Sequence, residues 1–124
     1  MSALRQMRSS SPPHLKLVRP PLHVRVCMVD AIPMGQGRAF VIGEHTIALF
    51  RQRDGNVFAI DNACPHRGGP LAEGIAGGGF VICPLHGWKI ELRSGRCAAE
   101  SAGVRSHAVE IVDDELWVTL EGDA

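Results

Sequence analysis

The chain has 124 residues, and its 13 basic side chains are balanced by 13 acidic ones. This length fits one domain with a modest core, and the neutral balance gives no basic surface for nucleic acid. No apolar run reaches the roughly 20 residues that a bilayer span needs, and no apolar stretch of a signal peptide follows the first basic residues. We therefore expect no membrane association and a cytoplasmic protein, where the four cysteines remain reduced.

The first twenty residues differ in composition from the rest. They contain the run Ser9-Ser10-Ser11-Pro12-Pro13, four basic residues and no acidic ones, which is too polar to form a core. We predict a flexible basic tail over residues 1–20 and a folded domain over 21–124. An alternative role for the tail is a basic arm that docks on a partner, since the rest of the chain is net acidic.

From residue 22 onward the pattern predicts an all-β protein. Short runs rich in Val, Ile and Phe are bounded by Gly, Asp and Asn, and no stretch has a convincing helical period. Hairpin turns are predicted at 43–45, 53–56 and 113–115, a Gly-rich turn at 75–79 and one short helical turn at 70–73. The predicted strands are 24–29, 38–42, 46–51, 57–61, 80–83, 88–92, 109–112 and 116–120.

Two short stretches pair a cysteine with a histidine, and sixteen residues separate His66 from Cys83: Cys64-Pro65-His66-Arg67-Gly68 and Cys83-Pro84-Leu85-His86-Gly87-Trp88. Two thiolates and two imidazoles make a set of four metal ligands. Zinc accepts such a set, but common zinc fingers take both cysteines from one segment and both histidines from another. A mixed pair from each loop fits a two-iron cluster better, because each iron then receives one kind of ligand.

The stretches resemble those of the Rieske family, in which two histidines replace two cysteines on one iron of a [2Fe-2S] cluster. The resemblance covers most of residues 22–120 and is sharpest over 63–96. It implies one cluster, with Cys64 and Cys83 on one iron and His66 and His86 on the other. It also implies the Rieske fold: an antiparallel β sandwich base with a small inserted cluster-binding subdomain.

The ligand set also predicts the redox range. Two ferric ions, two sulfides and two thiolates sum to zero charge, so the cluster accepts an electron more readily than an all-cysteine one. High-potential members join the loops by a disulfide at positions that match Gly69 and Leu85, and place a hydroxyl where Trp88 stands. Neither feature is present, and the chain contains no tyrosine. We predict a midpoint in the lower part of the Rieske range of about −150 to +300 mV.

The resemblance implies a soluble electron carrier without substrate-converting residues of its own, so whether it counts as an enzyme is left open. Its partners would be a flavin-containing reductase or large subunit and a terminal metalloenzyme. The stretches over 64–74 and 83–97 are more similar to the small subunit of assimilatory NAD(P)H nitrite reductase. The alternative is the ferredoxin component of a ring-hydroxylating dioxygenase system. A third alternative is an interaction module that holds zinc or no metal.

The remaining chemistry-bearing residues have plainer interpretations. Arg67 is expected at a solvent-facing tip, as a solvated charge or a docking contact. Cys27 is expected in the core, and a disulfide between Cys27 and Cys97 is disfavoured. Trp88 should shield the loop or join the core, and Trp117 should be core. The histidines without a cysteine at ligand spacing are expected at the surface or in turns: His14, His23, His45 and His107.

Overall fold

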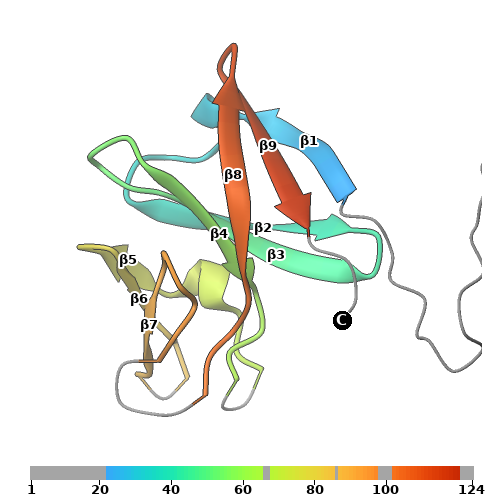
Figure 1. Cartoon of the computed structure of the whole chain (residues 1–124). Helices are drawn as coiled ribbons and strands as arrows, with labels where there is room; N and C mark the ends of the chain where they lie inside the picture. The colour runs from blue at the N-terminus through green and yellow to red at the C-terminus, as the bar shows by residue number, and fades with distance from the viewer. Residues whose placement is uncertain (1–21, 66–67, 86, 98–101, 121–124) are drawn as a thin grey trace, which may run out of the picture.

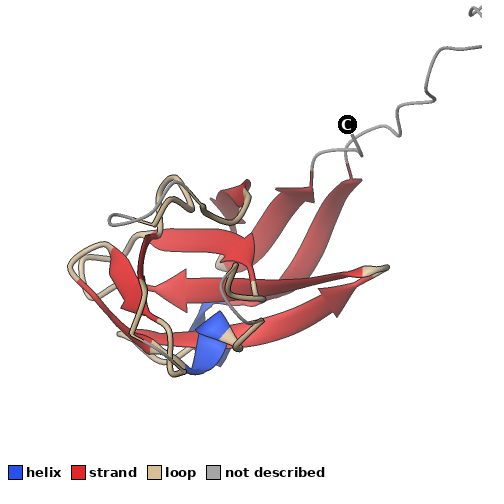
Figure 2. Cartoon of the chain, turned by 90° about the horizontal axis from the view of Figure 1, so that it is seen from below, coloured by secondary structure: helices blue, strands red, loops and turns tan. Residues whose placement is uncertain are grey.

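The computed structural model describes residues 22–65, 68–85, 87–97 and 102–120. Within these ranges the chain is all-β, with two antiparallel sheets and two single-turn 3-10 helices (Figures 1 and 2). The predicted tail, residues 1–20, lies outside them. No helix in the described ranges is long and apolar enough to cross a membrane.

The larger sheet has six strands in the order β1-β9-β8-β4-β3-β2. They are β1 (Leu22–Met28), β2 (Gln36–Ile42), β3 (His45–Arg51), β4 (Val57–Asp61), β8 (Ser106–Val112) and β9 (Glu115–Leu120). β4 and β8 pair only through Ala59 with His107 and Ile60 with Ser106. Side chains from both halves of this sheet, β1-β9-β8 and β4-β3-β2, enclose one core, so the sheet folds over itself as a sandwich.

The smaller sheet has three strands: β5 (Ile75–Gly77), β6 (Phe80–Ile82) and β7 (Lys89–Glu91). It lies below β4 in the view of Figure 1, and the segments that leave β4 and β6 run to the same end of the molecule. The helices are η2 (Val29–Ala31) and η3 (Leu71–Glu73), and η3 contacts β2 and β3.

Two buried cores meet at β3. Ile47 and Leu49 point into the base core, whereas Ala48 and Phe50 point into the subdomain core. Because a strand alternates its side chains between two faces, burial of both faces requires a continuous apolar run. The base core comprises Ile32, Ile47, Leu49, Ala59, Leu116, Val118 and Leu120. The subdomain core comprises Ala48, Phe50, Ile60, Cys64, Leu71, Ala72, Val81, Cys83, Ile90, Leu92 and Cys97.

The predicted fold class is confirmed, and each predicted strand overlaps an observed one. The predicted short helical turn at 70–73 is confirmed as η3. The prediction of a turn over 75–79 is wrong in its first half. Residues Ile75–Gly77 form β5, paired with β6, and only Gly78 and Gly79 make the turn, with φ of 60° and 87°. Helix η2 was not predicted.

Two side chains lie in surroundings that differ from those predicted. Trp117 was expected in the core but is half-buried, and its ring stacks on His23 with the centroids 4.9 Å apart. Alternation along β9 places Leu116 and Val118 in the base core, so Trp117 faces the other side. His107 was expected at the surface and is instead 9% exposed.

Candidate metal centre

The first ligand loop, which we define as residues 64–69, leaves the end of β4. The Cys64 side chain is buried with the residue only 3% exposed. Its backbone N–H donates to the Gly69 carbonyl at 2.9 Å, and its carbonyl accepts from the Gly68 N–H at 2.7 Å. Gly68 has φ of 72°, a left-handed conformation that favours glycine. These contacts close a tight turn that starts at the predicted ligand.

The second ligand loop, residues 83–88, joins β6 to β7 and repeats this pattern. The Cys83 N–H donates to the Trp88 carbonyl at 2.8 Å, and the Cys83 carbonyl accepts from the Gly87 N–H at 3.1 Å. Gly87 has φ of 75°, and Cys83 is 4% exposed. In both loops the cysteine thus bonds to the fourth and fifth residues after it.

The two loops touch each other. A Cβ placed on Gly69 would lie 2.9 Å from both Cγ and Cδ1 of Leu85 and 3.1 Å from the Cys83 Sγ. Leu85 therefore packs directly on the Gly69 backbone, beside the second thiol. Gly69 and Leu85 are the positions at which the sequence excludes a disulfide, and there the leucine side chain packs against the glycine backbone.

These observations fit a metal centre that takes thiolate ligands. All four cysteines lie in the described part of the chain, and none forms a disulfide. Cys64 and Cys83 are buried together in the subdomain core, on loops in van der Waals contact. Two soft donors on hydrogen-bonded turns supply half of the four protein ligands that a [2Fe-2S] cluster takes.

The other half of the predicted ligand set, His66 and His86, lies outside the described residues, as does Arg67. Among the residues that are described, no group of three His, Cys, Asp or Glu side chains forms a metal site. The structure therefore bears on the predicted set only through its two cysteines.

The remaining cysteines have other surroundings. Cys97 is buried in the subdomain core, where its backbone pairs with Ile90. Cys27 was expected in the core and is half-buried, packed against the base core. Burial raises the pKa of the Cys27 thiol, although the nearby charges of Arg25 and Arg38 act in the opposite direction. Cys27 is therefore a protonated thiol at neutral pH.

Asn62 positions the first ligand loop and was not predicted from the sequence. Its carbonyl accepts from the Leu71 N–H at 2.7 Å, and its side-chain Oδ1 accepts from the Ala72 N–H at 2.9 Å. Its own N–H donates to the Thr46 carbonyl at 3.0 Å. One residue thus joins both ends of the loop to β3. The side-chain partner lies ten residues away, too far for a local sequence signal.

A partly buried hydrogen bond between His107 and Asp61 lies just before the first ligand loop. The Nε2–H of His107 donates to Asp61 Oδ1 at 2.8 Å, and Arg105 approaches Asp61 Oδ2 at 3.7 Å. Burial would raise the pKa of Asp61, but the hydrogen bonds and positive charges of His107 and Arg105 together hold that pKa below its usual value. The pair joins β4 to β8 where their backbone pairing is short. The surface role expected for His107 is therefore wrong.

Comparisons of the sequence and of the structure with known proteins lead to the same family. A family model for the Rieske [2Fe-2S] domain matches residues 23–114. A 4beta-methylsterol monooxygenase from Methylococcus capsulatus is 47% identical over 83 residues, which cover 58% of this chain and 22% of the monooxygenase. The nitrite reductase [NAD(P)H] large subunit of Klebsiella oxytoca is 39% identical over 99 residues, covering 75% of this chain and 10% of that subunit. The chain thus spans only a small part of these two relatives.

Other relatives are of similar length to this chain. The anthranilate 1,2-dioxygenase ferredoxin subunit of Burkholderia cepacia is 35% identical over 94 residues, covering 74% of this chain and 86% of the ferredoxin. A solved structure described as an NADH-dependent nitrite reductase small subunit from Mycobacterium tuberculosis superposes with a TM-score of 0.75 and 25% identity. That match covers 82% of this chain and 96% of the small subunit.

The family match covers the smaller sheet, both ligand loops and the strands of the larger sheet other than β9, apart from the first residue of β1. It implies a Rieske-type [2Fe-2S] cluster as the cofactor, which agrees with the two buried thiols on touching loops. This chain belongs to the Rieske [2Fe-2S] domain family.

Proposed function

We propose that the chain is a one-electron carrier that links a flavin-containing reductase or subunit to a terminal metal centre. The observation that carries the proposal is the pair of matching loops, each presenting a buried thiol, in contact through Gly69 and Leu85. A [2Fe-2S] cluster bound there supplies reversible uptake of a single electron. The two rigid turns support that role, because little rearrangement between redox states keeps electron transfer fast.

We assign Cys64 and Cys83 to one iron, and His66 and His86 to the other. The assignment of the histidines rests on their places in the sequence motif, and that of the cysteines also on burial and loop contact. The backbone turns hold the main chain of each cysteine in place, which supports a preorganised ligand site.

The test is an EPR spectrum of the full chain, purified without oxygen and reduced with dithionite. We expect a red-brown protein with the rhombic signal of mixed His and Cys ligation. Replacing Cys83, His66 or His86 by Ala should abolish the signal. Cys97→Ala is the matched control, since Cys97 is equally buried in the same core but lies outside both loops, and it should retain the signal. A colourless protein with stoichiometric zinc would contradict the proposal.

For the pathway, we propose a role like that of the nitrite reductase small subunit. The motif stretches and the superposition over 96% of a chain so described support this role. The second candidate is the ferredoxin of an oxygenase system, supported by the match over 86% of the anthranilate dioxygenase ferredoxin. Reoxidation of the reduced protein by a siroheme nitrite reductase large subunit favours the first role. Reoxidation by a ring-hydroxylating oxygenase, with no response to the large subunit, favours the second.

We also propose that residues 21–124 form the electron-transfer domain, that residues 1–20 are an appendage to it, and that the protein acts in the cytoplasm. The family match over residues 23–114 supports the domain boundary. Deleting residues 1–20 should leave the EPR signal unchanged. Loss of the signal on that deletion would mean that the electron-transfer domain includes part of residues 1–20.

A further inference from the structure

The two ligand loops are carried by different sheets. The first continues β4 of the larger sheet, and the second joins β6 to β7 of the smaller sheet. The separation between the proposed ligands of the first loop and those of the second therefore depends on how the β6–β7 hairpin is attached to the larger sheet. Any residue that fixes this attachment also fixes the geometry of the cluster site.

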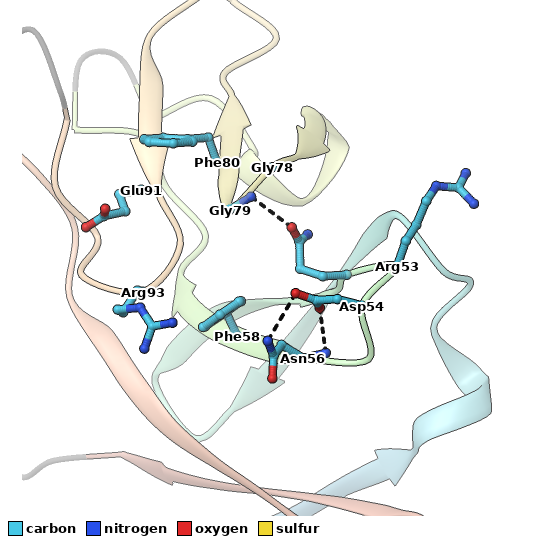
Figure 3. A pocket seen from close by; sticks show the side chains of 10 residues that line it. Arg53, Asp54, Asn56, Phe58, Gly78, Gly79, Phe80, Glu91 and Arg93 are labelled. Atoms are coloured by element: carbon cyan, nitrogen blue, oxygen red, sulfur yellow. Dashed lines mark hydrogen bonds between the residues drawn. The ribbon is translucent and has the colours of Figure 1, made fainter.

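Gln52 makes such an attachment. It follows β3 directly and is only 6% exposed. Its Oε1 accepts a hydrogen bond from the Gly79 N–H at 3.0 Å, drawn as a dashed line in Figure 3. The same Gly79 accepts from the Leu92 N–H through its carbonyl at 2.9 Å. One residue at the end of the hairpin is thus bound both to the residue after β3 and to the residue after β7.

The backbone of Gln52 is itself fixed. Its N–H donates to the Asn56 carbonyl at 2.8 Å, and its carbonyl accepts from the Gly55 N–H at 3.0 Å. The turn is held further by Asp54, whose carboxylate accepts from both the backbone and the side chain of Asn56, at 2.9 and 3.1 Å (Figure 3). The side chain of Gln52 therefore extends from a rigid base toward the hairpin.

The hairpin transmits this position to the second ligand loop. Its register pairs Phe80 with Glu91 at the anchored end and Ile82 with Lys89 at the other. Cys83 is the next residue after Ile82. The hydrogen bond from its N–H to the Trp88 carbonyl continues the strand pairing into the loop. Only the three residues of β6 separate the anchored Gly79 from the proposed ligand Cys83.

The second polar atom of Gln52 gives an independent indication. Its Nε2 is buried and has no hydrogen-bond partner among the residues that the structure describes. An unsatisfied buried donor lowers stability, so an apolar side chain of similar length would remove that penalty at the cost of the bond to Gly79. These two effects change stability in opposite directions. The distinctive contribution of Gln52 is the directed bond to the hairpin.

We propose that Gln52 is a positioning residue that sets the second ligand loop against the first by holding Gly79. The inference rests on the proposed assignment of Cys83 as a cluster ligand. Gln52 touches neither proposed pair of ligands and acts through β6 alone.

The test compares Gln52→Met with Gln52→Glu in the full-length protein carrying its cluster. Methionine has a similar length but no acceptor for Gly79, whereas glutamate keeps one. We expect Gln52→Met to change the EPR line shape and to release the cluster to a chelator about three- to tenfold faster, the range set by loss of one hydrogen bond. Its thermal unfolding midpoint should stay close to that of the unaltered protein. Gln52→Glu should keep the EPR line shape and the release rate.

A measurement on the unaltered protein makes the test independent of whether the variants fold. Amide hydrogen exchange of the Gly79 N–H should be protected together with that of Val81 in β6. Fast exchange at Gly79 would overturn the proposal directly. So would a Gln52→Met protein with unchanged line shape and release rate. If the unaltered protein lacked a Rieske signal, the proposed function would fail instead, and Gly79 protection would still report on the anchor.

Discussion

Replacement of Gly69 by alanine should disturb the contact between the two ligand loops. Gly69 does not have a positive φ, so its backbone tolerates a side chain. A methyl group there would instead lie 2.9 Å from two Leu85 carbons and 3.1 Å from the Cys83 Sγ. Carbon atoms pack well at about 3.5–4.0 Å. The added methyl must therefore push the two loops apart.

The expected cost follows from which neighbours can yield. Leu85 is half-exposed and can rotate away, but Cys83 is buried within a hydrogen-bonded turn. Overpacking in protein interiors costs about 1–3 kcal/mol, and partial yielding by Leu85 places Gly69→Ala near the middle of that range. If the cost falls on the cluster-bound state, chelator-driven loss of the cluster should accelerate by about tenfold or more.

A double-mutant cycle isolates the contact. Leu85→Ala removes two of the three close atoms, so the Gly69→Ala/Leu85→Ala protein should be less destabilised than the sum of the single variants. The expected coupling is about 1 kcal/mol, within the range for residues in contact. Strictly additive effects on cluster loss and urea unfolding would refute the loop contact.

Gly68→Ala is the matched control for this cycle. An added Cβ at Gly68 meets no atom of the described residues within 4 Å, but the backbone has φ of 72°. The cost there is backbone strain of about 1–2 kcal/mol. Because Leu85 plays no part in that strain, Leu85→Ala should give no relief at position 68.

Three further outcomes are expected. Asn62→Leu should destabilise the protein by about 1–3 kcal/mol, because the buried Ala72 N–H loses its acceptor, whereas Asn62→Asp keeps an acceptor and should cost less in urea unfolding. The lowered pKa of Asp61 means that the Asp61–His107 contact stabilises the fold fully above the unfolded value of about 3.9 and is lost as pH falls further. Asp61→Asn should flatten the loss of stability on acidification below about pH 4, and an unchanged acid limb would contradict the assignment. The redox midpoint should lie below about 0 mV, and a titration well above zero would refute the argument from missing hydrogen-bond donors.

Sequence patterns predicted the strands in which apolar and polar residues alternate and the strands that are buried on both faces. The run Ile47–Phe50 is apolar because its alternate residues enter two different cores, and that pattern is visible without coordinates. The same reasoning could not find β5. Ile75–Gly77 is short and glycine-rich, and it is a strand only because β6 supplies its hydrogen-bond partners.

The polar contacts around the candidate site were not predictable in the same way. His107 is buried because Asp61, 46 residues earlier, accepts a hydrogen bond from its Nε2–H. Gln52 reaches Gly79 across 27 residues, and Asn62 reaches Ala72 across ten. None of these separations follows a helical or strand period, so only the tertiary fold reveals them. The two cysteines were predicted as ligands because their spacing from histidine is itself the signal, and that ligand role stays a prediction.

The two ligand loops share a backbone turn but not a ligand spacing. In each, the cysteine bonds to the residues four and five positions later, and the fourth residue is a glycine with positive φ. The histidine, however, stands two positions after Cys64 and three positions after Cys83. The repeated element is therefore the turn that fixes each thiol, while the proposed imidazoles start from different points along it. Each proposed pair takes one ligand from each loop, so the spacing within both pairs depends on how the two turns are set against each other. That relative setting is governed by the Gly69–Leu85 contact and the Gln52–Gly79 bond. Changes at those positions should therefore alter the spacing of both proposed pairs, and Cys83 lies nearest to both contacts.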